Sequence, residues 1–312
     1  MLPLIIISSI LTAYLAICLF FSETILHPRR QPLVKNPRDY GMGYENVEFE
    51  SSDGLKLKGW LIPGASDRII VIAHPGSFNR CGTSVRHQGF FKFAVKDVEF
   101  LKTARQLQRA GYWVLMFDFR NHGASQTSRN GGITGVGLDE WRDVIGAVNF
   151  IENNSALKDK KIGLVSFCMG ANASIIALSK AKKDLIGVKC LLAIQPVSTN
   201  VFIRSFVRDK YTSLGVRLFV PLTDKICQWR GGYPLAKMSP REFARDIFIP
   251  ALYVQTETDP WTELSDIGGF YDQTPEPKEF LLLKGKMNRF DTYNYFGDHP
   301  EKMLEFLDKW MN

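Results

Sequence analysis

The sequence is poor in cysteine, and none of its cysteines are paired at a short spacing. Five cysteines are spread over 312 residues, so the chain resembles neither a disulfide-stabilised secreted protein nor a zinc protein. A compartment that keeps thiols reduced fits this pattern. No cluster of side chains in the sequence demands a metal ion, and we expect no cofactor.

The sequence also lacks the features of nucleic-acid-binding and disordered proteins. Its formal net charge is +7, but the basic residues are scattered and no stripe alternates aromatic with basic residues. Nucleic acid is therefore not an expected partner. With 45% hydrophobic and 23% charged residues, the composition is that of a globular protein long enough for one large or two small domains.

Charged residues are absent from residues 2–21, which read LPLIIISSILTAYLAICLFF. About 20 apolar residues suffice for an α-helix to cross the hydrocarbon core of a membrane. A cleavable signal peptide would carry Lys or Arg before its apolar region and a small-x-small site after it, and the sequence has neither. A buried core helix is disfavoured because the segment has almost no polar face. We therefore predict a transmembrane anchor over residues 1–22.

Basic residues follow the apolar segment, and none precedes it. They are Arg29, Arg30, Lys35 and Arg38. The positive-inside rule then places the N-terminus outside and the remaining chain in the cytoplasm. We expect a single-pass membrane protein with a Pro-rich linker over residues 23–39 and one domain over residues 40–312.

Within this domain, β-rich and helical patterns alternate. Residues 46–63 alternate apolar and polar residues around Ser-Ser-Asp-Gly, which predicts an antiparallel hairpin. Further strands are expected over residues 68–74, 112–119, 161–167, 188–195, 251–257 and 279–285, with helices over 97–110, 139–151 and from Pro300. This order predicts a mainly parallel sheet with helices on both faces. The alternation of strand and helix patterns is interrupted over residues 199–240, where we expect an inserted, mostly helical cap.

The strand expected at residues 161–167 runs directly into a helix through residues 165–171, which read VSFCMGA. Reactive groups in parallel sheets stand beyond the carboxyl ends of the strands. A sharp turn here presents Cys168 at a helix N-terminus, where the helix dipole and free amides favour a thiolate and the amide of Met169 can bind an oxyanion. Two alternatives remain: Cys168 is a small buried hydrophobic residue, or Ser166 is the nucleophile.

This turn resembles the Gly-x-Ser-x-Gly nucleophile elbow of the α/β-hydrolase superfamily, and Phe-Cys-Met-Gly is similar to the cysteine elbow of dienelactone hydrolases. It departs from the pattern in having Ser166 for the first glycine and Ala171 for the frequent second one. The resemblance implies an α/β-hydrolase fold with a mainly parallel eight-stranded sheet and a short helical cap. It also implies a hydrolase that acts through a covalent acyl-cysteine.

Two more segments resemble turns of this superfamily. Residues 73–80, AHPGSFNR, resemble its oxyanion loop, which implies that an amide near Gly76 or Ser77 is the second donor. An ordinary loop is the alternative. Residues 118–125, DFRNHGAS, resemble a turn that is usually scaffold in the family. We therefore interpret His122 as structural and His74 as a residue that orients its loop.

The acid of a catalytic triad is expected on a turn after the next-to-last long strand. Asp259 in TETDPW stands there, with Glu257 as a weaker candidate. Its task would be to orient and stabilise an imidazole beside Cys168. An ordinary aspartate that caps the following helix is the alternative.

The histidine that relatives carry soon after the last strand is missing, because Asn288 and Arg289 occupy the expected place. His299 is the only histidine further on, so it is the candidate base if its loop reaches Cys168. Otherwise it is merely a residue at a helix start. Without it, the helix dipole and cations such as Arg289 would have to activate the thiol, or catalysis has been lost.

These residues predict a membrane-anchored hydrolase that cleaves an ester, lactone or thioester through acyl-Cys168, assisted by Asp259 and His299. The anchor and the aromatic residues of the cap favour a small-molecule or lipid-like acyl substrate, although the same aromatics would also suit a core. One alternative is an acyltransferase that uses the same cysteine. Another is a catalytically degenerate scaffold, which the missing histidine favours.

Overall fold

A central eight-stranded sheet organises the computed structural model, which describes residues 1–88 and 93–312. Its strand order is β1-β2-β6-β3-β7-β8-β9-β10. The strands are β1 (Glu45–Glu50), β2 (Lys56–Ile62), β3 (Arg68–Ala73), β6 (Trp113–Phe117), β7 (Lys161–Phe167), β8 (Val188–Ile194), β9 (Ala251–Thr256) and β10 (Lys278–Leu283). Strand β2 runs antiparallel to both neighbours, and the other pairs are parallel. The predicted mainly parallel eight-stranded sheet is confirmed.

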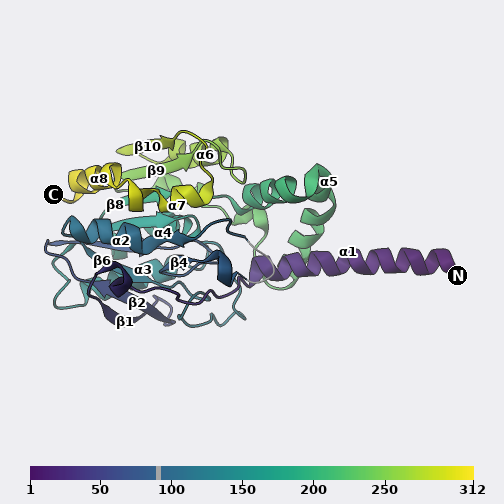
Figure 1. Ribbon diagram of the computed structural model, residues 1–312, viewed down its shortest axis with the longest axis horizontal. Coiled ribbons are helices and arrows are strands. Elements are labelled where there is room, and N and C mark those ends of the chain that lie inside the picture. Colours follow the sequence, from purple (N-terminus) through teal and green to yellow (C-terminus); the bar gives the residue numbers. More distant parts are fainter. Residues whose placement is uncertain (89–92) are drawn as a thin grey trace.

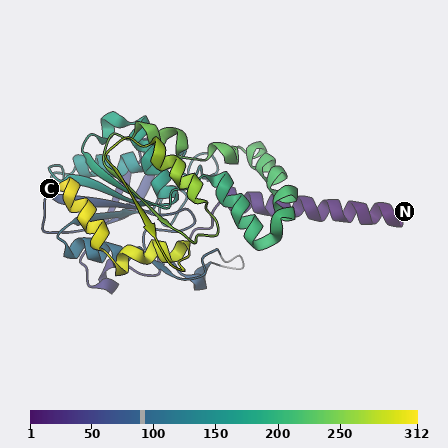
Figure 2. The same cartoon turned by 90° about the horizontal axis from the view of Figure 1, so that it is seen from above.

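Helices cover both faces of this sheet (Figure 2). On one face lie α2 (Phe100–Arg109), α7 (Arg289–Asp298) and α8 (Glu301–Met311), and on the other α3 (Trp141–Glu152), α4 (Met169–Lys180) and α6 (Leu264–Gln273). Strand β3 shows why two cores form: Ile70 and Ile72 enter the first and Ile69 and Val71 the second. Successive side chains of a strand point to opposite faces, so a strand buried on both sides is apolar throughout.

Smaller elements complete the domain. A separate two-stranded sheet pairs β4 (Gly82–Thr83) with β5 (Val98–Glu99). Short 3-10 helices are η1 (Pro37–Tyr40), η2 (Val85–His87), η3 (Lys182–Leu185), η4 (Leu235–Lys237) and η5 (Arg241–Asp246).

Two long helices stand outside this layered body. Helix α1 (Leu2–Leu26) projects away from it, and α5 (Thr199–Trp229) lies beside the part of α1 that is nearer the body (Figure 1). An 18-residue window of α1 has a mean hydropathy of 2.5, and 6% of it is buried. Its length and composition suit a membrane span, and also a signal sequence. Helix α5 falls within the predicted cap segment and is kinked at Thr212, where φ is 78°.

Candidate active site

Cys168 occupies the turn between β7 and α4 in a strained conformation. Its φ of 48° and ψ of −111° are unusual for a residue other than glycine, and such backbone strain costs on the order of 1–3 kcal/mol. Main-chain hydrogen bonds hold the turn, because the Cys168 amide donates to Ile194 O at 2.8 Å and the Cys168 carbonyl accepts from the Asn172 amide at 2.9 Å. The partly exposed side chain lines a cavity at the end of α4.

Gly170 allows α4 to begin directly against the end of β3. A Cβ at this position would lie 2.3 Å from the carbonyl oxygen of Ala73. Gly170→Ala is expected to lower the free energy of unfolding by about 1–3 kcal/mol, because the main chain would have to move. The matched control is Gly268→Ala in α6, where a Cβ would meet no described atom within 4 Å. Urea unfolding should show a loss for the first variant only; equal stability of the two would contradict this close approach.

Two backbone amides are available beside Cys168. Met169 opens α4, so its N–H has no partner within the helix. Gly76 packs against the Met169 side chain, since a Cβ on Gly76 would lie 3.5 Å from Met169 Sδ. Neither amide donates to another described residue. The amide of Ser77 differs, because it donates to His122 Nε2 at 3.1 Å. Of the predicted oxyanion donors, Met169 and Gly76 are therefore free and Ser77 is not.

His74 and His122 brace the loops behind these amides. His74 Nδ1 lies 2.7 Å from Pro75 O and Nε2 accepts from the Phe119 amide, while His122 Nδ1 lies 2.8 Å from Arg120 O. Each ring therefore donates with one nitrogen and accepts with the other, as a neutral imidazole does. Burial lowers the pKa of both histidines, that of His74 by a large amount.

This burial predicts a loss of stability in mild acid. Below about pH 6.5 the unfolded chain protonates these histidines and the folded chain does not, so unfolding is favoured as the pH falls. The free energy of unfolding should drop by up to about 1.4 kcal/mol per pH unit for each histidine. Urea unfolding at several pH values should give a shallower slope for His74→Gln than for the exposed control His87→Gln. Equal slopes would contradict the prediction.

Asp259 follows β9 in a network of hydrogen bonds. Its Oδ1 accepts from the Trp261 amide at 3.0 Å, and its Oδ2 accepts from Thr262 Oγ1 at 2.7 Å. The carboxylate is fully buried, and Oδ2 lies 2.8 Å from Arg289 Nη2. Although that contact is not aligned as a hydrogen bond, it is a short, buried ion pair. The partner of Asp259 is thus an arginine rather than a histidine.

Arg289 and Tyr293 lie one helical turn apart on α7 and connect this ion pair to Cys168. Arg289 Nη1 donates to Tyr293 Oη at 2.6 Å. Burial opposes the charge of Arg289, but attraction to Asp259, Tyr293 and Cys168 outweighs it and raises the pKa of the guanidinium. Burial also raises the pKa of Tyr293 well above its usual value, and electrostatic interaction with Cys168 raises it further. The neutral tyrosine hydroxyl and the thiol line the same cavity.

The other predicted side chains lie apart from Cys168. His299 is exposed at the C-terminal end of α7, 5.0 Å between ring centroids from Tyr295, and does not line the cavity. Because α7 is a regular helix, it carries His299 about 9 Å along its axis beyond Tyr293. The expectation that His299 is the base is thus corrected. Ser166 is no rival nucleophile, because it is buried with its Oγ 2.8 Å from Ser174 Oγ.

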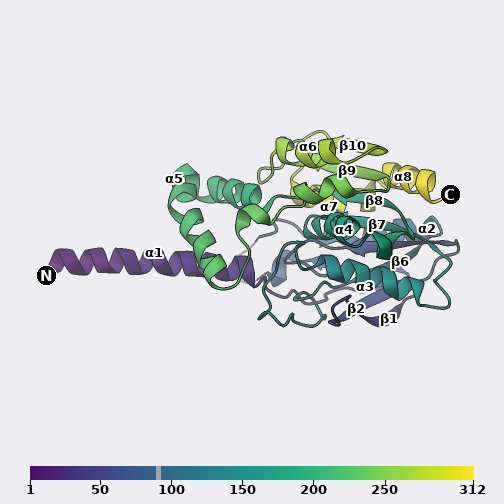
Figure 3. The same ribbon diagram turned by 180° about the vertical axis from the view of Figure 1, so that it is seen from behind.

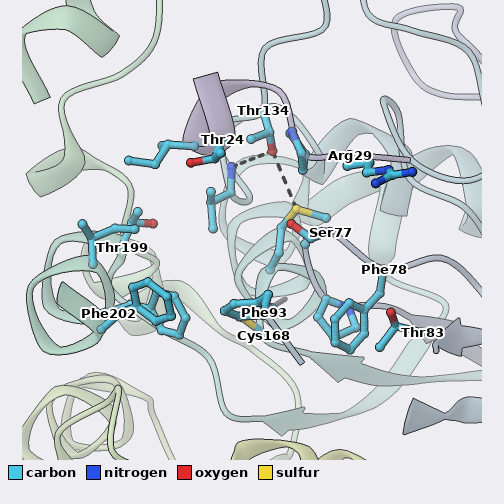
Figure 4. Close-up of a pocket in the computed structure, with 18 of the residues that line it drawn as sticks. Thr24, Arg29, Ser77, Phe78, Thr83, Phe93, Thr134, Cys168, Thr199 and Phe202 are labelled. Atoms are coloured by element: carbon cyan, nitrogen blue, oxygen red, sulfur yellow. Dashed lines mark hydrogen bonds between the residues drawn. The ribbon is translucent and has the colours of Figure 1, made fainter. Parts of the chain in front are cut away.

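The cavity above Cys168 has a volume of about 410 Å³ and lies between the domain, α1 and α5 (Figure 4). Its lining comes from the end of α1, the loop after β3 and the start of α5. The residues include Phe20, Glu23, Thr24, Gly76, Phe78, Phe202, Ile203 and Phe206. Cys168, Met169, Arg289 and Tyr293 line it as well. Aromatic and aliphatic side chains predominate, so an apolar ligand is accommodated next to the thiol.

Comparisons with known proteins agree with this fold. A family model described as alpha/beta hydrolase fold matches residues 87–208. The polyketide transferase grgF of a Penicillium species is 22% identical, over 85% of this chain and 96% of that protein. The thiohydrolase aneE of Aspergillus aculeatus is 29% identical, over 53% of this chain and 46% of that protein. A solved esterase of Pyrococcus furiosus has a TM-score of 0.68 and 22% identity, covering 92% of this chain and 99% of that chain.

The class of protein follows from the sheet, the strand-to-helix turn and these matches: the chain has the α/β-hydrolase fold. The family model matches residues 87–208, and the solved esterase shares the fold over most of the chain. In sequence it is similar to a polyketide transferase and a thiohydrolase, and in fold it is similar to an esterase. The likeness of its cysteine turn to that of dienelactone hydrolases stays a prediction.

Proposed function

We propose that this protein is a membrane-anchored enzyme that takes an acyl group from a thioester onto Cys168. The observation that carries the proposal is the thiol itself. Cys168 lies at the N-terminus of α4, in an apolar cavity, next to the unpartnered amides of Met169 and Gly76. Anchoring by α1, with the domain in the cytoplasm, belongs to the same proposal.

The proposed reaction begins with attack of the Cys168 thiolate on the carbonyl carbon of the substrate, after the thiol proton has passed to solvent. The oxyanion that forms accepts hydrogen bonds from Met169 and Gly76, which act as preorganised donors. The tetrahedral intermediate then collapses: the bond to the substrate sulfur breaks, the departing thiolate takes up a proton from solvent, and acyl-Cys168 remains.

A thioester suits this site better than an ester, because the partner of Asp259 is the cation Arg289 and not a histidine base. An alcohol leaves as a strongly basic alkoxide and needs a proton donor, which a histidine usually supplies. A thiol has a pKa of about 8.5 and leaves as a thiolate without that help. Exchange between two thioesters is also nearly balanced in energy, so the first step needs little driving force.

The same lack of a base favours acyl transfer over hydrolysis. Water has to lose a proton to attack acyl-Cys168, and the linked side chains of Asp259, Arg289 and Tyr293 cannot take it. Tyr293 is a neutral hydroxyl whose pKa is raised, Arg289 is a cation, and Asp259 is occupied by Arg289. We therefore propose a thiol as the acceptor of the acyl group and hydrolysis as the slower outcome. The relatives grgF and aneE, a transferase and a thiohydrolase by name, support both outcomes.

Intact-protein mass spectrometry tests the proposal. The full chain in detergent micelles is incubated with the octanoyl thioester of N-acetylcysteamine. We expect one octanoyl adduct, located at Cys168 by peptide mapping and removed by added thiol. The adduct should be missing in Cys168→Ala and unchanged in the control Cys81→Ala, which alters a buried thiol. If the unaltered chain stays unmodified, or if Cys168→Ala is acylated equally, the acyl-cysteine mechanism is wrong.

A non-catalytic scaffold is the second candidate, and Arg289 is the observation that favours it. A cation paired with Asp259 stands where a base is expected, and it stabilises the fold without performing proton transfer. An unmodified Cys168 in the thioester experiment, together with tight binding of the intact thioester, would support this candidate.

A further inference from the structure

Helix α5 contacts α1 along much of the latter's second half (Figure 3). Tyr14 Oη donates to Leu218 O at 2.7 Å. Further toward the domain, the rings of Phe21 and Tyr211 are 5.8 Å apart. Because Tyr14 and Phe21 both belong to the uncharged segment 2–21, α5 packs on part of the segment that is predicted to lie in the membrane.

The length of α1 determines whether α5 also lies within the membrane. A helix rises 1.5 Å per residue, so residues 2–21 provide about 30 Å, the thickness of the hydrocarbon core. If α5 lay wholly in water, only residues 2–13 would remain for the membrane. They provide about 18 Å, which is too short to span it. A membrane-spanning α1 therefore requires the part of α5 beside Tyr14 to lie within the lipid.

The surface of α5 suits such a position. Leu214 and Leu218 are 62% and 48% exposed, large values for leucine. Arg217 is the only charged residue in positions 211–223, and its long side chain can extend toward the headgroups. Thr212, the non-helical residue of α5, follows Tyr211, whose ring lies beside Phe21 near the end of the apolar segment of α1. At this level water can reach the backbone groups of Thr212.

Basic residues flank this apolar stretch. They are Arg204, Arg208, Lys210 and Lys225, all of them exposed, and they outnumber the acidic residues Asp209 and Asp224, of which Asp209 pairs with Lys210. Side chains of this kind attract anionic lipid headgroups. The pattern of an apolar centre with basic flanks is typical of helices that enter the surface of an anionic membrane.

We propose that residues 211–222 of α5 insert beside α1 into the leaflet nearest the domain, with anionic headgroups around the basic flanks. This inference rests on the proposed anchoring by α1. It also identifies the route of the substrate, because Phe20 of α1 and Phe202 and Phe206 of α5 line the cavity of Cys168. The cavity then opens at the membrane surface, and its substrate is a long-chain acyl thioester whose chain enters from the lipid.

Fluorescence quenching of a site-specific probe tests the depth of α5. The nitrobenzoxadiazole fluorophore is attached to a cysteine introduced at Leu218, in the full chain carrying Cys168→Ser and reconstituted into phosphatidylcholine–phosphatidylglycerol vesicles. Two further chains carry the probe at Ile10 in α1 or at Ile186, which is exposed on the domain. We expect aqueous iodide to quench the probe at Leu218 severalfold less than that at Ile186, and doxyl-labelled lipid to quench it strongly.

The three probe positions distinguish failure of the proposal for α5 from failure of the anchoring by α1. If Ile10 is protected from iodide but Leu218 is quenched like Ile186, α1 is inserted and the proposal for α5 is overturned. If iodide reaches both Ile10 and Leu218, the anchoring by α1 fails and the proposal for α5 fails with it. Acylation of Cys168 is measured separately in micelles, so neither result bears on the thioester chemistry.

Discussion

Replacement of Arg289 by histidine is expected to raise the rate of hydrolysis of acyl-Cys168 by about 10²–10⁴-fold, the usual contribution of a positioned general base. Arg289 pairs with Asp259 and donates to Tyr293, and both Arg289 and Tyr293 line the cavity of Cys168. An imidazole there would be oriented by Asp259 and could take the proton of the attacking water. The rate should rise with pH and level off above about pH 6.5, as a histidine loses its proton.

Single-turnover decay of the octanoyl adduct, followed by intact mass, measures this rate, and the release of octanoate identifies hydrolysis. Arg289→Lys is the control, because it keeps a cation and supplies no neutral base. We expect its adduct to decay as slowly as that of the unaltered chain. If Arg289→His folds, becomes acylated and hydrolyses no faster than Arg289→Lys, then the lack of a base at this position does not limit deacylation.

The fold was predictable because its determinants are local. Strands β3 and β7 are short apolar runs followed by turn residues, and this pattern is recognisable in the sequence without the tertiary structure. Helix α7 was missed although its start carries a signal. Asn288 accepts from the amide of Asp291, whose carboxylate accepts from the amide of Asn288, which is a capping box. Its Asn-x-x-Asp spacing is present in the sequence and predicts a helix that begins at Arg289.

The site was less predictable because its decisive contacts join distant segments. The spacing around Cys168 and Asp259 marks both positions, but the sequence does not reveal which side chain α7 brings between them. That depends on where α7 begins, and a shift of one residue turns Arg289 by about 100° around the helix axis. The amide of Ser77 shows the same limit: its motif predicted a free donor, and a tertiary contact with His122 occupies it.

Asp259→Asn is expected to lower the free energy of unfolding by about 3–5 kcal/mol, the cost of leaving one member of a buried ion pair without its partner. Arg289 is 1% exposed, so water cannot compensate the charge that remains. Urea unfolding of the full chain in micelles measures the loss. The control is Asp67→Asn, which removes an exposed pair with Lys161 and should change stability by less than about 1 kcal/mol.

The double variant Asp259→Asn/Arg289→Met separates loss of a charge pair from general damage to the loop. Removal of both charges leaves no uncompensated cation, and methionine fills much of the space of the arginine. Because replacement of a buried ion pair by apolar residues is often neutral, the double variant should recover most of the stability that Asp259→Asn loses. If it is as unstable as the single variant, then Asp259 stabilises the fold through its bonds to Trp261 and Thr262, and the arginine is held mainly for its position beside Cys168.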